Sequence, residues 1–343
     1  MSYINVWSPD SSLSKSYVGK LEGHSGIVVS CKILPNSPNC LSVDDKNDIR
    51  IWDLRTYMTV QLIRDEVSIT KGLGKSSHSS VTCLEVIPYT DRFVVGGKRI
   101  QLYNNDYMRK NLETFNEELY AIHVEFNPYY KTFWVLTKID LRIYDAFTGK
   151  LLKVFNDLFD DRVTGELTSY AVGDRLRKFY IADNQGLIRK YNCNNGEIIQ
   201  KIVSLKQLRE ASKMNNALQQ QSMTGAGGGQ NQTLASKMQN AANLGKRENY
   251  EVSKILYLEE EKLLISGSCD SVIRVYEADQ EQENQLLREL KDGHKDSEVT
   301  ALEYSSEYMR LVSGSSNGIV SVWDFENNKA EAIFREHQTD VQC

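Results

Sequence analysis

The 343-residue sequence predicts an all-β protein built from a repeated unit of four short strands. A run of alternating apolar and polar residues that ends in Trp or Tyr recurs along the chain, as alternation in a half-buried strand requires. Successive copies lie 41 to 51 residues apart, except for one interval of 85. A period of this length is typical of the four-stranded blades of a β-propeller. The composition, 41% hydrophobic and 25% charged, is that of a chain that can bury a core.

Seven aromatic residues, which we call anchors, end the repeated runs. They are Trp7, Trp52, Tyr103, Tyr144, Tyr191, Tyr276 and Trp323. Tyr takes the place of Trp in four of them, which helps to explain a chain with 18 Tyr and only 4 Trp. Each anchor therefore predicts the third strand of one blade.

Further β-rich runs occupy matching places around the anchors. First strands are expected at 28–34, 81–87, 123–128, 252–258 and 299–304, second strands at 93–97, 179–186, 264–270 and 311–317, and fourth strands at 59–63, 150–155, 197–202 and 331–334. Antiparallel strands this short are joined by tight polar turns. Four of them in sequence make one blade.

The two ends of the chain supply only parts of a blade. Residues 1–21 offer a third and a fourth strand, whereas residues 335–343 offer the beginning of a first strand. We therefore expect a single domain over residues 1–343, a propeller of seven blades of which six are complete and one is split. The second strand of the split blade is missing, so we expect either a fragment of a longer polypeptide or a blade completed from elsewhere.

The interval of 85 residues between Tyr191 and Tyr276 holds one blade and an insertion. The surplus, residues 204–249, is rich in Gln, Asn and Gly, with a glycine tract at its middle. Such a composition predicts a disordered surface segment. A partner-binding arm that folds on contact is the alternative, and the residues do not decide between the two.

Paired motifs make the family resemblance explicit. Gly23-His24 and Gly293-His294 precede Trp52-Asp53 and Trp323-Asp324 by 28 and 29 residues. This resembles the GH…WD signature of the WD-repeat β-propeller family, over essentially the whole chain outside the insertion. His78 and His337 fall at the same place in their own units.

The resemblance implies that a His, a Ser or Thr, an Asp and the anchor Trp form a hydrogen-bonded set that locks each blade. A buried imidazole needs such partners for both nitrogens. The residues expected in these sets are His24, Trp52, Asp53, His78, Ser268, Asp270, Tyr276, His294, Ser315, Asn317, Trp323 and Asp324, with Asn317 replacing the Asp beside His294. The Tyr144 and Tyr191 units lack both the GH pair and a clear Asp, so we expect packing alone to hold them.

Charge and motif content exclude several classes of function. A net charge of −5 and a pI of about 5.7 argue against a nucleic-acid binder. No run approaches the length of apolar residues that a membrane-spanning helix needs. The acidic run 44–48 lacks the Gly and Glu of a calcium-binding loop. No nucleophile elbow is present either, so we expect no enzyme, no cofactor, no metal and no small-molecule substrate.

A propeller presents two faces and a rim, which suits a scaffold that binds other proteins. The sequences of residues 23–55, 144–155 and 174–199 resemble those of large tandem WD-repeat proteins of the ciliary and flagellar axoneme. That resemblance implies a cytoplasmic or cytoskeletal protein of a microtubule-associated axonemal complex. The alternative is a substrate-receptor adaptor of a cullin-type ubiquitin ligase, because Trp52-Asp53-Leu54-Arg55 resembles the WDxR docking element, with Arg55 as the contact residue.

Overall fold

A computed structural model gives the arrangement of most of the chain. It describes residues 2–7, 17–64, 81–88, 90, 92–104, 113–114, 120–156, 158–159, 165–173, 177–202, 251–278, 286–337 and 339–342. The insertion at 204–249 and His78 lie outside the described residues. Within the described ranges the chain forms strands and turns and no helix, which confirms the all-β prediction.

Six antiparallel sheets of four strands follow one another along the chain, each with its strands in sequence order. The first three are β3(Val28–Ile33) β4(Asn39–Asp44) β5(Asp48–Asp53) β6(Met58–Arg64), β7(Cys83–Ile87) β8(Arg92–Gly96) β9(Gln101–Asn104) β10(Glu113–Thr114), and β11(Ala121–Asn127) β12(Thr132–Thr137) β13(Leu141–Asp145) β14(Leu151–Phe155). The next three are β15(Leu167–Val172) β16(Lys178–Asp183) β17(Ile188–Asn192) β18(Ile198–Ile202), β19(Val252–Leu258) β20(Leu263–Ser268) β21(Ile273–Glu277) β22(Leu286–Leu290), and β23(Val299–Ser305) β24(Arg310–Ser315) β25(Val320–Asp324) β26(Lys329–Phe334). A two-stranded sheet, β1(Ser2–Trp7) and β2(Tyr17–His24), precedes them.

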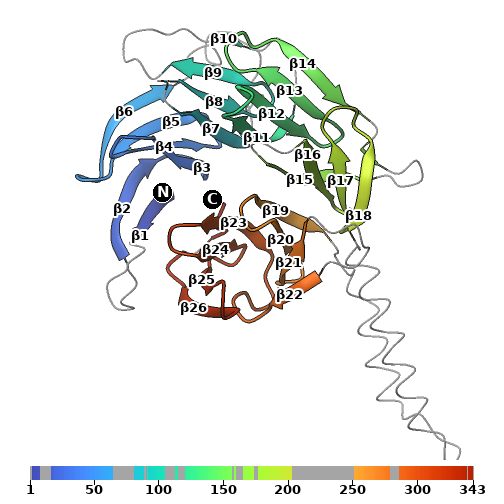
Figure 1. Cartoon of the computed structure of the whole chain (residues 1–343). Helices are drawn as coiled ribbons and strands as arrows, with labels where there is room; N and C mark the ends of the chain where they lie inside the picture. Colours follow the sequence, from blue (N-terminus) through green and yellow to red (C-terminus); the bar gives the residue numbers. More distant parts are fainter. Residues whose placement is uncertain are drawn as a thin grey trace, which may run out of the picture.

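We name each four-stranded sheet a blade, after its anchor in the third strand. In chain order they are the Trp52, Tyr103, Tyr144, Tyr191, Tyr276 and Trp323 blades. Figure 1 shows the blades following one another around a common centre, with the two chain ends close together. The first strand of each blade contacts the first strand of the next, from β3 through to β23. The chain is therefore a β-propeller in which six blades are complete.

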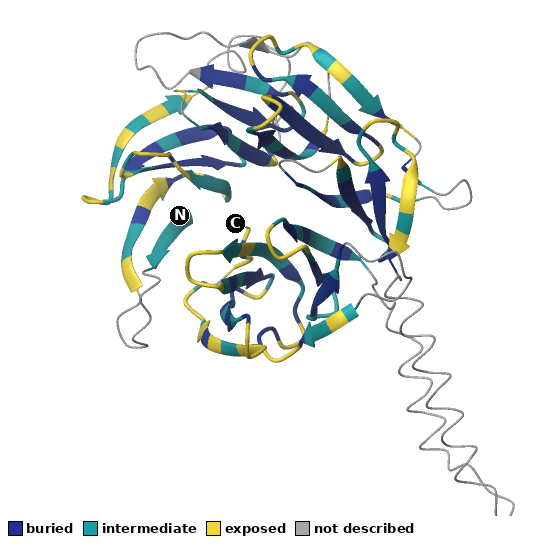
Figure 2. Ribbon diagram, viewed as in Figure 1, coloured by how far each residue is buried: buried dark blue, intermediate teal, exposed yellow. Residues whose placement is uncertain are grey.

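The core lies between neighbouring blades. Leu41 and Val43 of β4 pack with Leu84 and Val86 of β7, and the other core clusters likewise join one sheet to the next. All six blade anchors are buried. Figure 2 shows the middle strands of the blades largely dark blue and the outermost strands largely teal and yellow. Each blade thus buries both of its faces and exposes its outer edge, as in a stack of repeats that stabilise their neighbours.

Five strands were not predicted from the sequence: β4, β10, β12, β15 and β22. The β12 strand, TFWVLT, is buried at every position, so it shows none of the alternation that marks a half-buried strand. The β10 strand comprises only two residues. The other strands occur where the repeat places them, and their ends differ from the predicted ends by a few residues.

Candidate functional site

A buried hydrogen-bonded set joins the end of β2 to the Trp52 blade. The His24 imidazole lies 2.6 Å from the Ser42 hydroxyl through Nε2 and 3.2 Å from the Asp44 carboxylate through Nδ1. The Trp52 indole N–H donates to the same Ser42 hydroxyl at 2.7 Å. Because a carboxylate can only accept, Nδ1 carries the proton, and Ser42 therefore donates to Nε2 while it accepts from Trp52. All four side chains are buried.

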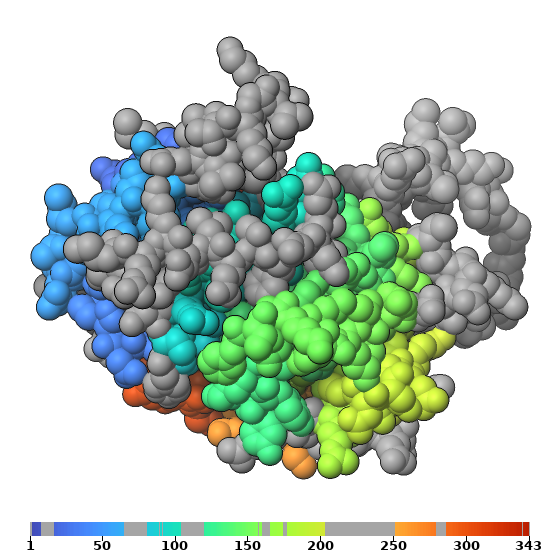
Figure 3. All heavy atoms as spheres, turned by 90° about the horizontal axis from the view of Figure 1, so that it is seen from above, coloured from blue at the N-terminus to red at the C-terminus, as the bar shows by residue number. Residues whose placement is uncertain are grey.

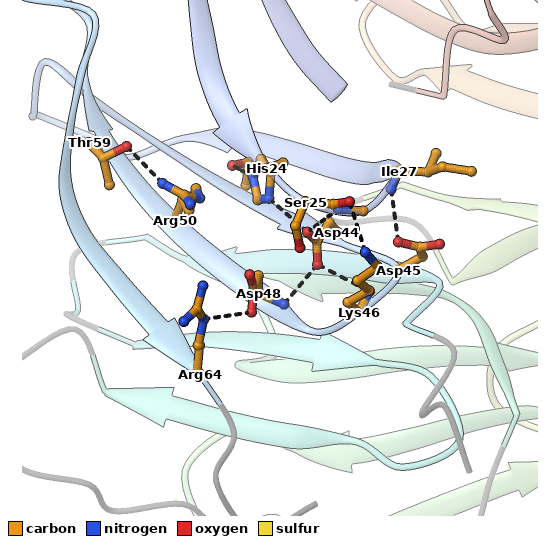
Figure 4. A network of polar contacts seen from close by, with 12 residues as sticks. His24, Ser25, Ile27, Asp44, Asp45, Lys46, Asp48, Arg50, Thr59 and Arg64 are labelled. Atoms are coloured by element: carbon orange, nitrogen blue, oxygen red, sulfur yellow. Dashed lines mark hydrogen bonds and ion pairs between the residues drawn. The ribbon is translucent and has the colours of Figure 1, made fainter. Parts of the chain in front are cut away.

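Asp44 also holds the turn that follows β4. One carboxylate oxygen accepts from the backbone N–H groups of Lys46 and Asp48, and the other accepts from that of Gly26. Figure 4 shows Asp44 at the centre of this network, between His24 and Asp48. Burial lowers the pKa of His24, with the Asp44 carboxylate acting in the opposite direction. Burial thus favours the neutral imidazole, which holds the serine and the aspartate together.

Ser42 and Asp44 were not expected in this set, since the run 44–48 was considered only as a calcium-binding loop. A signal was present, because Ser42 precedes Trp52 by the same ten residues that separate Ser313 from Trp323. The Asp53 of the WD pair, which was expected in the set, lies outside it. Its carboxylate instead accepts from the backbone and side chain of Arg55 in the next turn.

The Trp323 blade has the same contacts between a histidine, a serine and the anchor, but the serine is not the predicted one. His294 Nε2 lies 2.6 Å from the hydroxyl of Ser313, not of Ser315, and the Trp323 indole N–H donates to Ser313 at 2.7 Å. Both serines share one face of β24, because side chains alternate along a strand. Ser313 pairs with Ser321, two residues from Trp323, whereas Ser315 lies about 7 Å farther along the strand. Only Ser313 is within reach of the indole.

Ser315 and Asn317 form a separate contact at the end of β24. The Ser315 hydroxyl lies 2.7 Å from Asn317 Oδ1 and 3.0 Å from the Ile319 carbonyl. Asn317 therefore does not replace the Asp beside His294. Nδ1 of His294 is buried and has no hydrogen-bond partner among the described residues. Burial lowers the pKa of His294 to about 4.

The Tyr276 blade uses an ion pair in place of a histidine. Asp270 binds Arg274 through both carboxylate oxygens, the shorter contact being 2.7 Å, and Arg274 also contacts Glu289 at 3.0 Å. Ser268, expected in the same set, is buried, and its hydroxyl has no hydrogen-bond partner among the described residues. Tyr276 is also buried and the Asp270 side chain is 6% exposed, but the three predicted residues do not form one hydrogen-bonded set.

The Tyr144 and Tyr191 blades are not held by packing alone, contrary to the sequence-based expectation. In the Tyr191 blade Asp183 binds Arg189 at 2.7 Å, and both side chains are fully buried. In the Tyr144 blade Asp140 accepts from Thr137 at 2.6 Å and from Arg142 at 3.0 Å. The arginines precede their anchors by two residues, as does Arg274. Arg50 holds the same position in the Trp52 blade, where it donates to the Thr59 hydroxyl at 3.1 Å instead.

The acidic residues of the two WD pairs cap turns at the edge of the propeller. Asp324 accepts from the backbone N–H groups of Glu326 and Asn327. Arg55 lies on the Asp53 carboxylate with Nη2–Oδ2 at 2.8 Å, and its side chain is 72% exposed. The side-chain hydrogen bond from Arg55 is the first cause that lowers the pKa of Asp53 to about 2. Arg55 is thus accessible, although its charge is already paired.

The first strands of the blades bring charged groups together around the centre. Lys32 of β3 binds Glu85 of β7 at 3.1 Å. Burial works to lower the pKa of Lys32, but Glu85, with Glu303 and Glu125 farther off, raises it above its ordinary value. Burial likewise raises the pKa of Glu85. The described residues contain no cluster of three or more potential metal ligands.

The described ranges contain no membrane-spanning helix, and the thiol of Cys83 is not activated. No helix there is long and apolar enough to cross a bilayer. Burial raises the pKa of Cys83 to about 11, so this thiol is a poor nucleophile at neutral pH.

Comparison with known proteins agrees with this geometry. The model of the "WD domain, G-beta repeat" family matches residues 15–53 and 284–324, which contain the two histidine-bearing sets. Cilia- and flagella-associated protein 337 B of Tetrahymena thermophila is 24% identical over 196 residues, which cover 57% of this chain and 14% of the relative. The WD repeat-containing proteins on the Y chromosome of Drosophila grimshawi and Drosophila virilis are each 23% identical over 208 residues, covering 57% of this chain and 17% of the relative.

The family match, the six four-stranded blades and the His–Ser–Trp contacts lead to one assignment. The chain spans less than a fifth of each of these relatives, so they bear on the fold of this part and not on a whole protein's activity. The chain therefore contains WD40 repeats and folds as a WD-repeat β-propeller.

Proposed function

We propose that this propeller is a non-catalytic protein-interaction scaffold in a microtubule-associated complex of the ciliary or flagellar axoneme. WD-repeat propellers are typically scaffolds that bind other proteins. The observation that carries the finer proposal is the similarity, over 57% of the chain, to a relative named as cilia- and flagella-associated. The expected location is therefore the axoneme, within the cytoskeletal compartment.

The arrangement of the titratable groups supports a role without catalysis. His24 and His294 are each held by a serine that also binds an indole, which leaves neither imidazole facing a cleft. Asp183 and Asp270 are neutralised by arginines. These groups stabilise the blades, and a substrate would have to displace them.

An exposed aromatic cluster on the Tyr144 blade is the first surface to examine for partner binding. Tyr129 and Tyr130 follow β11, and their rings lie 4.9 Å apart, whereas Phe147 follows β13. The backbone N–H of Ala146 donates to the Lys131 carbonyl, so the two turns are neighbours. The three residues are 63%, 49% and 52% exposed. Figure 3 shows the surface of this blade, in green, as the broadest coloured region of that view.

Exposed aromatic residues are enriched at the centres of protein interfaces. We propose that a protein of the axonemal complex docks on this cluster through an apolar segment of its own. Electrostatic attraction contributes less there, because Lys131 is the single charged residue among the turn residues 128–131. Binding at this surface should therefore tolerate salt.

The test of the proposed role is the location of the protein. A fluorescent fusion expressed in a ciliated cell should concentrate in cilia and remain there after detergent removes the ciliary membrane. A fusion that stays in the cell body, or that leaves with the detergent fraction, would contradict the proposal.

The ubiquitin-ligase alternative depends on Arg55, which is exposed in the turn after β5. A cullin adaptor that recognises this side chain would have to share the guanidinium with Asp53. We expect no cullin adaptor to co-purify with the wild-type chain. Recovery of an adaptor that is lost with Arg55→Ala, and retained with the matched exposed variant Arg64→Ala, would replace the scaffold proposal.

A further inference from the structure

Arginine occupies one position, two residues before the anchor, in four of the six blades. In three of them the guanidinium binds an aspartate of its own blade at 2.7–2.9 Å, and these pairs are Arg142–Asp140, Arg189–Asp183 and Arg274–Asp270. The fourth arginine is Arg50 of the Trp52 blade, and no carboxylate among the described residues contacts it. The repeat therefore shows that a carboxylate is the ligand that suits an arginine at this position.

Asp48 holds the place in the Trp52 blade from which Asp140 binds its arginine, because each precedes its anchor by four residues. Asp48 instead binds Arg64 of β6, with 3.2 Å between the Nε and Oδ1 atoms. Figure 4 shows Asp48 bonded to Arg64 while Arg50 is bonded to Thr59. This carboxylate is thus committed to a different arginine.

Asp44 holds the place from which Asp183 binds its arginine, eight residues before the anchor. Its carboxylate accepts from the His24 imidazole and from three backbone N–H groups of the turns beside it. Each oxygen therefore already accepts two hydrogen bonds, which is the capacity of a carboxylate oxygen. Neither aspartate is available to Arg50.

Neutral groups hold the Arg50 guanidinium in its present position. Its Nη1 donates to the Thr59 hydroxyl at 3.1 Å, and its central carbon lies 5.6 Å from the centre of the Trp52 ring. Its Nε is buried and has no hydrogen-bond partner among the described residues. Because an indole face and a hydroxyl do not neutralise a cation, the guanidinium keeps a strong attraction for an anionic group.

The residues beside the Arg50 guanidinium are exposed. Gly23 lies against it, since a Cβ added at Gly23 would come within 2.8 Å of Nη1, and Gly23 is an exposed residue. On β6, Leu62 pairs with Arg50, and Val60 is the residue left unpaired by the bulge opposite Trp52. Val60 is 50% and Leu62 is 36% exposed. A segment of another protein can therefore contact the guanidinium and these two aliphatic side chains together.

We propose that Arg50 binds the carboxylate of an Asp or Glu side chain of a partner protein. This carboxylate takes the role that an aspartate of the same blade has in three other blades. It accepts from the Nη groups of Arg50, and the Thr59 hydroxyl, whose proton makes no hydrogen bond among the described residues, donates to it as a second contact. Aliphatic residues on either side of the acidic residue pack on Val60 and Leu62.

The geometry favours a carboxylate over a phosphate. A planar guanidinium matches a carboxylate with two parallel hydrogen bonds, as the Arg274–Asp270 contact shows in this protein. Phosphorylated segments are bound by clusters of arginines, whereas the nearby Arg64 is already paired with Asp48. The inference does not depend on the proposed ciliary role, and it concerns a different blade from the one that carries the exposed aromatic cluster.

Binding is tested with the 343-residue protein and two peptides, acetyl-Ser-Leu-Glu-Leu-Ser-amide and its counterpart with Gln in place of Glu. Burial of Nε slows the exchange of its proton with water, so the Nε–H resonance of Arg50 can be followed by NMR. The Glu peptide should shift this resonance in a saturable manner. The Gln peptide should bind about tenfold more weakly, because it lacks the charge-assisted hydrogen bonds.

Variants of the protein assign the contact to Arg50. Arg50→Gln should bind the Glu peptide about tenfold more weakly, followed by the backbone amide resonances of Thr59 and Leu62. Thr59→Val should weaken binding about threefold, because it removes one neutral donor. The matched control is Arg177→Gln, which removes an exposed arginine of the Tyr191 blade and should bind like the wild type.

A stability measurement distinguishes a binding arginine from a structural one. Arg50→Gln should leave the unfolding midpoint close to that of the wild type, because no carboxylate of the protein loses its partner. Arg189→Gln should lower the midpoint, because it leaves the buried Asp183 carboxylate unpaired. An equal loss in the two variants would make Arg50 a structural group and overturn the proposal.

Three binding results would also overturn it. The first is an Arg50 resonance that the Glu peptide does not shift, or that both peptides shift at equal concentrations. The second is a loss of affinity with Arg177→Gln as large as that with Arg50→Gln, which would indicate general charge attraction. The third is a resonance that inorganic phosphate shifts at lower concentration than the Glu peptide, which would assign the site to phosphate.

Discussion

Ser313 accepts the indole N–H of Trp323 at 2.7 Å and lies 2.6 Å from the imidazole of His294. Ser42 repeats both distances with Trp52 and His24 in a blade at the other end of the chain. One hydroxyl group thus satisfies two large buried side chains from different strands or loops. The serine, and not the acidic residue of the WD pair, is therefore the central residue of each His–Ser–Trp set.

The two serines of β24 should differ sharply in their importance. Ser313→Ala leaves the Trp323 indole N–H without an acceptor and His294 Nε2 without a donor, and should lower the free energy of unfolding by about 2–4 kcal/mol. Ser315→Ala removes a local contact at the strand end and should cost about 1 kcal/mol. Urea unfolding followed by tryptophan fluorescence measures both. Equal losses of unfolding free energy, or a larger loss for Ser315→Ala, would support Ser315, the residue predicted from the sequence, as the partner of His294 and Trp323.

Mild acid should destabilise the propeller through His294. Burial lowers the pKa of this imidazole from 6.5 to about 4, so the unfolded chain binds the proton more readily between those values. Stability is then unaffected by this group above pH 6.5 and falls as the pH drops below it. We expect a loss of about 2 kcal/mol from His294 between pH 7 and pH 5. Burial shifts the pKa of His24 in the same direction, which adds to the effect.

A substitution beside His294 separates this effect from general acid sensitivity. Ser315→Asp places a carboxylate where Asp44 lies in the Trp52 blade, eight residues before the anchor. It should supply an acceptor for the unpartnered Nδ1–H and raise the pKa of His294, so the loss between pH 7 and pH 5 becomes smaller. An unfolding midpoint of the wild type that is the same at both pH values would show that the imidazole is not held neutral by burial.

Removing one member of the buried pair in the Tyr191 blade should be far more costly than removing one member of a surface pair. Asp183→Ala leaves the buried guanidinium of Arg189 without its carboxylate and should cost about 3–5 kcal/mol. The matched control is Glu166→Ala, which breaks a contact of similar length, 2.8 Å, between exposed Lys138 and Glu166. The control should cost less than about 1 kcal/mol. Similar unfolding midpoints for the two variants would mean that packing alone holds this blade.

The repeat was readable from the sequence because one aromatic position recurs with alternating neighbours. Trp7, Tyr103 and Tyr191 are recognisable as anchors although none belongs to a WD pair. The strand β12 escaped prediction because a strand buried on both faces carries no alternation. The six complete blades and their third strands therefore followed from the residues, whereas some first, second and fourth strands did not.

The hydrogen-bonded sets and ion pairs inside the blades were less predictable from the sequence than the strands. Ser313 and Ser315 share a face, and only the register of β24 against β25 decides which of them reaches Trp323. Asp183 and Arg189 are six residues apart, and this spacing alone does not predict a buried ion pair. The hairpin between them brings the two side chains together, and that contact exists only in three dimensions.

The central claim, a scaffold that binds an axonemal complex, is tested most directly by co-sedimentation of the purified protein with demembranated axonemes. The wild type should sediment with axonemes, and should remain bound at raised salt. The triple variant Tyr129→Ser, Tyr130→Ser, Phe147→Ser should remain in the supernatant while its unfolding midpoint stays close to that of the wild type, because these side chains are exposed. The control Glu166→Ala should sediment like the wild type. A wild-type protein that stays in the supernatant, or a triple variant that sediments as well as the wild type, would contradict the account.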